Sequence, residues 1–324
     1  MRPLKNLAEV AVIGGGLAGL SAARQAARLG KLVTLFEGSG LYGGLVATVG
    51  EVSGLPFGGE PSGQEIAIAA LEECQKVGVR VIEAGVAQIG LGEQLSLTDD
   101  LGEFHQPDAV IVASGASLRR LGVPGEEEFL GRGVSRCATC DGGFYRGREV
   151  VVIGGGDSAV HEALVLARTS GQVTVVSRSP LSAQREYIDK LDARENVRFV
   201  WGSEVTAIVG ENGVSGVRLR NRNDGSESEL ACSGVFPFIG LEPNTRFLPP
   251  TLLDADGLVR TNADFASADP RVFTVGAARA NYGGHLIQAM AEGVGAAMAA
   301  ARLFKPGPNE HEQGIRHAKK IVAH

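Results

Sequence analysis

Residues 10–19 read Val-Ala-Val-Ile-Gly-Gly-Gly-Leu-Ala-Gly, and this stretch decides how the chain folds. The apolar residues 10–13 have the length and composition of a short buried strand. Gly14, Gly16 and Gly19 follow in the spacing Gly-x-Gly-x-x-Gly, and an alanine-rich helix is expected from Leu20 to Leu29. This succession is typical of the strand–turn–helix unit that binds a dinucleotide.

The next strand strengthens that interpretation. It is expected from Leu32 to Phe36 and ends in Glu37, where a carboxylate bonds a ribose hydroxyl in such units. The first glycine permits the turn, the second lets the backbone approach a pyrophosphate, and the third allows close packing. The amides at the helix N-terminus are donors for the phosphates. With Glu37 in place, the pattern predicts nucleotide binding far better than the glycines alone.

The same pattern returns about 140 residues later, at Gly154, Gly156 and Ala159, which indicates an internal duplication. A late strand at 272–276 and a long helix at 286–303 return the chain to the first unit. The sequence therefore predicts an α/β protein with two Rossmann-like, three-layer nucleotide-binding domains, the second inserted into the first. We expect the first domain at 1–117 and 244–302, the inserted domain at 118–243, and a C-terminal tail at 303–324.

Between the two glycine motifs lies Cys137-Ala-Thr-Cys140. Two cysteines separated by two residues can close a disulfide or open to a dithiol, and so exchange two electrons with a flavin or another disulfide. Structural zinc uses the same spacing, but Cys74 and Cys232 stand alone in the sequence, so no metal site is expected. Asp141 could take and return the thiol proton, although Asp before Gly-Gly is also ordinary turn chemistry.

The composition and charge argue against a nucleic-acid-binding, membrane-spanning or secreted protein. The chain has 324 residues with a net charge of -6, so nothing global favours nucleic acid or an anionic membrane as a partner. No apolar run is long enough to span a bilayer. Four cysteines, of which two are close together, do not make a secreted disulfide framework, and the N-terminus does not read as a cleavable signal. A cytoplasmic address is expected.

The run from Gly133 through Cys137, Cys140 and Asp141 to Gly142, followed by a second glycine loop, resembles the low-molecular-weight thioredoxin reductases. The similarity extends over nearly the whole chain. It implies FAD in the first domain, a homodimer, and electron transfer from the flavin through the Cys137/Cys140 dithiol to thioredoxin. It also implies further flavin contacts at these positions: Gly44, Leu45, Gly115, Gly276, Ala277, Gln288 and Ala289.

Two departures from the family bear on the cofactors. Where NADPH-using members carry several arginines around the 2′-phosphate, this chain keeps only Arg178, with Arg185 as a distant substitute. Each charge-assisted contact contributes roughly 1.5–3 kcal/mol, so two lost contacts weaken NADPH binding by about 10²–10⁴-fold. Where the family has Gly-Asp against the flavin ribityl chain, this chain has Gly276-Ala277, a loss on the order of 1–3 kcal/mol.

Three functions follow from these observations. The favoured one is a disulfide reductase that uses FAD, acts on thioredoxin and takes electrons from ferredoxin, with NADPH doubtful. The alternative is a conventional NADPH-dependent thioredoxin reductase, in which Gly154, Gly156, Ala159 and Arg178 hold the nucleotide. A flavoprotein redox sensor or scaffold is the third hypothesis, from a different functional class.

Overall fold

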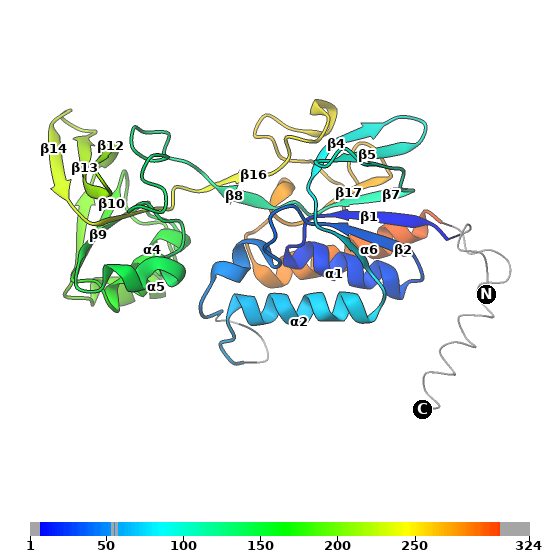
Figure 1. Cartoon of the computed structure of the whole chain (residues 1–324), viewed down its shortest axis with the longest axis horizontal. Helices are drawn as coiled ribbons and strands as arrows, with labels where there is room; N and C mark the ends of the chain where they lie inside the picture. The colour runs from blue at the N-terminus through cyan, green and yellow to red at the C-terminus, as the bar shows by residue number, and fades with distance from the viewer. Residues whose placement is uncertain (1–6, 53–54, 56–57, 305–324) are drawn as a thin grey trace. The chain divides into compact units, whose positions relative to one another are not determined.

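The computed structural model describes residues 7–52, 55 and 58–304. The predicted tail therefore lies outside the described residues except for 303 and 304. The described chain separates into two compact units (Figure 1). The first is drawn from residues 1–47, 51–115 and 243–324, and the second from 48–50 and 116–242.

The first unit is built on a five-stranded parallel sheet in the order β17-β7-β1-β2-β3. Its strands are β1 (Glu9–Ile13), β2 (Leu32–Phe36), β3 (Arg80–Ile82), β7 (Ala109–Val112) and β17 (Val272–Thr274). The helices α1 (Leu17–Arg28), α2 (Gly63–Lys76) and α6 (Leu286–Arg302) cover one face (Figure 1). An antiparallel sheet of β4 (Val86–Leu91), β5 (Leu95–Asp99) and β6 (Phe104–His105) covers the other.

The alternation of side chains along β1 explains these layers. Val10 and Val12 belong to the core beneath the helices, whereas Ala11 and Ile13 belong to the core shared with β4 and β5. Because both faces of the parallel sheet are covered, its strands are apolar on both sides.

The second unit repeats this plan. Its parallel sheet has the order β11-β10-β9-β15, from β9 (Glu149–Ile153), β10 (Gln172–Ser177), β11 (Val197–Trp201) and β15 (Gly234–Pro237). The helices α3 (Ala138–Asp141), α4 (Asp157–Ala167) and α5 (Arg185–Asp192) pack on one face of this sheet. An antiparallel sheet of β12 (Ser203–Gly210), β13 (Val214–Asn221) and β14 (Glu227–Ala231) packs on the other face.

Apart from the short segment 48–50, the chain changes unit after residues 115 and 242. The strands β8 (Ala116–Leu118) and β16 (Leu241–Pro243) at these two places pair with each other. Within the described ranges, short 3₁₀ turns also lie at η2 (Gly44–Thr48), η3 (Gly142–Tyr145), η4 (Pro250–Leu252) and η5 (Gly276–Ala278). The predicted α/β class with two Rossmann-like, three-layer nucleotide-binding folds is confirmed. The outer layer of each unit is an antiparallel sheet.

Candidate functional site

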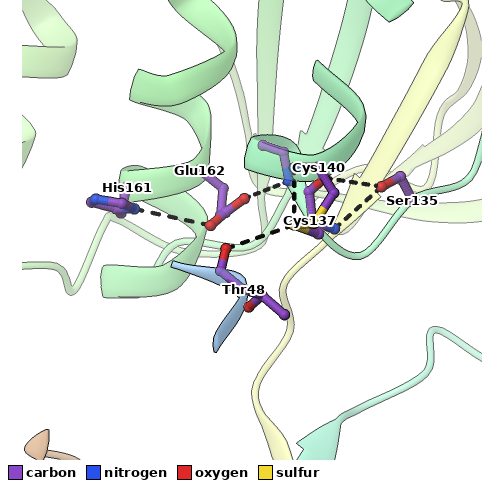
Figure 2. Close-up of a disulfide and its surroundings, with 7 residues drawn as sticks. Thr48, Ser135, Cys137, Cys140, His161 and Glu162 are labelled. Atoms are coloured by element: carbon purple, nitrogen blue, oxygen red, sulfur yellow. Dashed lines mark hydrogen bonds and ion pairs between the residues drawn. A yellow bond between two sulfur atoms is a disulfide. The ribbon is translucent and has the colours of Figure 1, made fainter. Parts of the chain in front are cut away.

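Cys137 and Cys140 form a disulfide in the second unit, with their Cα atoms 5.3 Å apart (Figure 2). Cys137 is the N-cap of α3, and its Sγ accepts a hydrogen bond from the backbone N–H of Cys140 at 3.1 Å. The N–H of Cys137 donates in turn to Ser135 Oγ at 3.2 Å. The turn therefore directs an amide at the Cys137 sulfur, which is the arrangement that stabilises a thiolate.

The disulfide is accessible to solvent. Cys140 is exposed and Cys137 is half-buried. Asp141, the last residue of α3, is also half-buried. Burial raises the pKa of Tyr145, and the charge of Asp141 raises it further. Asp141 thus places a carboxylate directly after Cys140 in the same turn.

Two residues that the sequence analysis missed lie behind the disulfide. Glu162 on α4 is buried, and its Oε2 accepts the backbone N–H of Ala138 at 2.6 Å. The adjacent His161 places its Nδ1 3.9 Å from Glu162 Oε1 (Figure 2). No sequence signal could have found this contact, because it joins residues 24 apart through the packing of α3 on α4.

In the first unit, the glycine turn before α1 is closely packed. A Cβ on Gly14, whose φ is +105°, would lie 2.4 Å from the carbonyl oxygen of Ala113. A Cβ on Gly19 would lie 1.9 Å from the oxygen of Gly14. At Gly16, by contrast, a Cβ would meet nothing within 4 Å, and the first turn of α1 carries no acidic residue. Gly16 and the α1 N-terminus therefore face open space that suits a pyrophosphate, so the residues present fit a dinucleotide.

Glu37 lies at the end of β2 and is buried. Its Oε2 accepts the N–H of Gly15 at 2.6 Å, and its Oε1 accepts the N–H of Ser39 at 2.7 Å. The carboxylate is thus fixed beside the glycine turn. Oε1 also accepts the Ser39 hydroxyl at 2.6 Å, so Oε2 is the oxygen that keeps a lone pair for a ribose hydroxyl.

Other predicted flavin contacts surround the same region of the first unit. Gly44 has a φ of +59° and begins η2, and a Cβ there would come within 3.6 Å of Gly16 Cα. Leu45 is exposed, and Gly115 has a φ of +66°. The structure thus brings Gly44 next to the glycine turn.

The segment at Gly276 holds a buried ion pair that the sequence analysis also missed. Glu292 on α6 is paired with Arg279 and accepts the N–H of Gly276 at 2.8 Å and Gln288 Nε2 at 2.8 Å. Burial would raise the pKa of Glu292, but these hydrogen bonds, above all the one from Arg279, lower it. Ala277 contributes no polar side chain, so the charges nearest to this turn belong to α6 and Arg279.

Two further predicted flavin contacts, Gln288 and Ala289, lie near the start of α6. The N–H of Ala289, however, donates to the carbonyl of His285 at 3.0 Å within α6. Because α6 begins at Leu286, that amide belongs to the helix ladder, and only residues 286–288 keep first-turn amides.

The second glycine motif has the same close packing as the first. A Cβ on Gly154, whose φ is +134°, would lie 2.1 Å from the oxygen of Phe238, whereas at Gly156 it would meet nothing within 4 Å. Ala159 on α4 is buried next to Gly154. Arg178, after β10, is exposed and lines a hollow together with these residues: Ser179, Pro180, Trp201, Gly202 and Asn223.

Comparisons with known proteins agree with this geometry. A family model described as pyridine nucleotide-disulphide oxidoreductase matches residues 8–293. The chain belongs to this family. It is 38% identical over 296 residues to the thioredoxin reductase of Treponema pallidum, covering 90% of this chain and 96% of that one. The bifunctional thioredoxin reductase/thioredoxin of Mycobacterium leprae is 39% identical over 79% of this chain and 56% of its own length.

A solved structure shows the same fold. The thioredoxin reductase of Lactococcus lactis superposes with a TM-score of 0.86 at 32% identity, covering 91% of this chain and 98% of that one. The resemblance to thioredoxin reductases drawn from the sequence is therefore confirmed. As a member of the pyridine nucleotide-disulphide oxidoreductases, the chain is a disulfide oxidoreductase and a flavoprotein.

The two free cysteines, Cys74 and Cys232, are buried and unreactive. Burial raises the pKa of Cys74 to about 11 and that of Cys232 to about 12, so both stay protonated near neutral pH. Among the described residues, no group of three or more His, Cys, Asp or Glu side chains could hold a metal ion. None of the helices within the described ranges has the length and apolar character needed to cross a membrane.

Proposed function

We propose that this protein reduces the disulfide of a thioredoxin through its own Cys137–Cys140 pair. The observation that carries the proposal is this disulfide, with Cys137 facing an amide and Cys140 exposed, in a chain whose named relatives are thioredoxin reductases. The fusion of thioredoxin reductase to thioredoxin in the Mycobacterium leprae relative supports the same partner.

The roles of the other residues follow from the geometry of the first unit. Gly14, Gly16, Gly19 and Glu37 would hold the dinucleotide part of FAD, with Gly44, Leu45, Gly115, Gly276, Ala277 and the first turn of α6 near its remainder. When bound, FAD would supply the two electrons that open the disulfide. Asp141 would hold and move the proton at the thiol of Cys140.

The comparisons favour a different electron donor from the ferredoxin expected from the sequence. The family is described by its use of pyridine nucleotides, and the relatives above are named as ordinary thioredoxin reductases. We therefore propose NADPH as the first candidate, held by Gly154, Gly156, Ala159 and Arg178. Ferredoxin is the second, favoured by the single Arg178 where NADPH-using members carry several arginines.

The resemblance also implies a homodimer and a cytoplasmic location. We propose both properties for this protein. The reducing conditions of the cytoplasm suit an exposed, exchangeable cysteine pair.

Substitution at the cysteine pair tests the proposed activity. We expect Cys137→Ser and Cys140→Ser each to reduce thioredoxin turnover at least about 10³-fold, because the exchange needs both sulfurs, while the flavin absorbance stays. Turnover is measured with thioredoxin coupled to a chromogenic disulfide. The matched control is Cys232→Ala, which removes a buried thiol and should leave turnover unchanged. A wild-type protein that binds FAD but turns over no thioredoxin would overturn the proposal in favour of the redox sensor.

Anaerobic bleaching of the flavin separates the two donors. If NADPH is the donor, micromolar NADPH bleaches the flavin and Arg178→Ala raises the required concentration about 10–100-fold, because one charge-assisted contact to phosphate is lost. If ferredoxin is the donor, reduced ferredoxin bleaches the flavin, NADPH does not, and Arg178→Ala has no effect. Arg218→Ala is the matched control, since Arg218 is an exposed arginine of the same unit that is paired with Glu229.

A further inference from the structure

Glu162 is a buried carboxylate that contacts the redox-active turn and has no part in the function described so far. It projects from α4 and accepts the N–H of Ala138, the residue that follows Cys137 (Figure 2). The same turn presents the N–H of Cys140 to Cys137 Sγ. The amide of Cys140 thus faces the sulfur, whereas the amide of Ala138 faces a carboxylate.

These two contacts act in opposite directions on a thiolate. The amide of Cys140 stabilises negative charge on Cys137, whereas a buried carboxylate one residue away disfavours a second negative charge. When two electrons break the S–S bond, uptake of two protons leaves two thiols. Uptake of one proton leaves a thiol and a thiolate, so the local charge decides how many protons are taken up.

We propose that Glu162 is a positioning residue that holds the Cys137–Cys140 turn and extends two-proton reduction of its disulfide to higher pH. The inference rests on the proposed function only in requiring this disulfide to be redox-active. Glu162 acts through the Ala138 amide and its charge, without touching thioredoxin.

Other charged and titratable groups surround the pair and bear on the same balance. The Nδ1 of His161 lies 3.9 Å from Glu162 Oε1. The remaining groups come from the neighbouring segments: Arg136 before α3, paired with Glu127 at 3.7 Å, Asp141 on α3, Tyr145 on η3, and Tyr187 on α5, whose ring packs edge-on to His161. Glu162 differs from the other carboxylates named here in being both buried and bonded to the turn.

The test uses the complete reduced flavoprotein and compares it with Glu162→Gln, which keeps an oxygen to accept the Ala138 N–H and removes the charge. The alkylation rate of Cys137 and Cys140 by iodoacetamide is followed by mass spectrometry between pH 5 and 10. We expect the midpoint of thiolate formation to fall by about one pH unit in the variant, which is about tenfold faster alkylation near neutral pH. Glu186→Gln, at an exposed carboxylate of α5 in the same unit, is the matched control and should match wild type.

The midpoint potential of the disulfide, set with dithiothreitol redox buffers, gives an independent measurement. A two-electron couple changes by about 30 mV per pH unit for one proton and about 59 mV for two. We expect the change between these slopes to occur at lower pH in Glu162→Gln than in wild type.

The outcomes separate this inference from the proposed function. A wild-type disulfide that dithiothreitol cannot reduce contradicts the proposed function. A reducible disulfide with the same alkylation profile and slope change in Glu162→Gln overturns the inference alone. If Glu162→Gln does not fold, Glu162→Asp replaces it: its charge lies one methylene farther from the turn, so alkylation near neutral pH should be about twofold faster than in wild type. Equal rates at every pH would again overturn the inference.

Discussion

Gly16 and Gly19 stand three residues apart in one motif, yet the structure gives their missing side chains different consequences. A Cβ on Gly19 would overlap the carbonyl oxygen of Gly14, which is backbone and cannot move aside cheaply. A Cβ on Gly16 would project into open space, and Gly16 has an ordinary φ of -67°. Packing therefore requires glycine at position 19, whereas the space beside position 16 is free for a ligand.

This difference predicts opposite phenotypes for two alanine substitutions. Gly19→Ala should lower the free energy of unfolding of the apoprotein by roughly 3 kcal/mol, as overpacking does. Gly16→Ala should leave that free energy within about 0.5 kcal/mol of wild type but reduce the bound FAD, because its methyl group occupies the phosphate position. Urea unfolding and the flavin-to-protein absorbance ratio measure the two quantities. Full FAD content in Gly16→Ala would contradict the assignment of this turn to the cofactor.

At the scale of elements, α2 shows how a local signal defines a helix. Its N-cap Ser62 accepts the N–H of Glu65, and Glu65 Oε2 accepts the N–H of Ser62 at 2.8 Å, so the two residues form a capping box. The helix then packs on α1 through Cys74, whose Sγ donates to the carbonyl oxygen of Leu20 at 3.2 Å. Caps of this kind satisfy amides that the helix leaves open.

Removal of this cap should lower the stability of the protein slightly. We expect Ser62→Ala to lower the free energy of unfolding by about 1 kcal/mol, because the Glu65 amide loses its acceptor. Chemical denaturation measures the change. Gln64→Ala, at an exposed position in the same turn, serves as the control and should have no destabilising effect. Equal stability of the Ser62 variant and the control would count against a working capping box.

At the scale of the whole molecule, carboxylates fixed in the folded state govern the response to acid. A hydrogen bond from His105 holds the pKa of Asp99 below its ordinary value, and Arg271 does the same for Asp269. Glu292 also has a lowered pKa despite its burial. A group with a lowered folded-state pKa stabilises the protein above the unfolded pKa and loses that contribution as the pH falls through the folded one.

The free energy of unfolding should therefore decrease as the pH falls below about 4, because the unfolded chain then binds more protons than the folded one. Urea midpoints between pH 3 and 7 measure this dependence. Asp99→Asn keeps an oxygen for the amides of Leu101 and Glu103 but does not titrate, so its stability should fall less steeply with acid. An unchanged slope in this variant would exclude Asp99 from the effect.

Much of this molecule could be predicted from its sequence, because the signals are local. The spacing of Gly14, Gly16 and Gly19, the duplicate motif at Gly154, and the Cys137–Cys140 pair depend on residues that are neighbours along the chain. Strand and helix limits followed from the same short-range patterns to within a few residues. The donor was the exception: ferredoxin was inferred from missing arginines, and the comparisons favour a pyridine nucleotide.

Only the tertiary structure decided which distant side chains meet. The contact of Glu162 with Ala138 and the pairing of Arg279 with Glu292 join separate elements, and each depends on how two of them pack. Local sequence thus determined the motifs and their chemistry, whereas packing determined the charges around them, because burial and long-range hydrogen bonds have no signature in residue spacing.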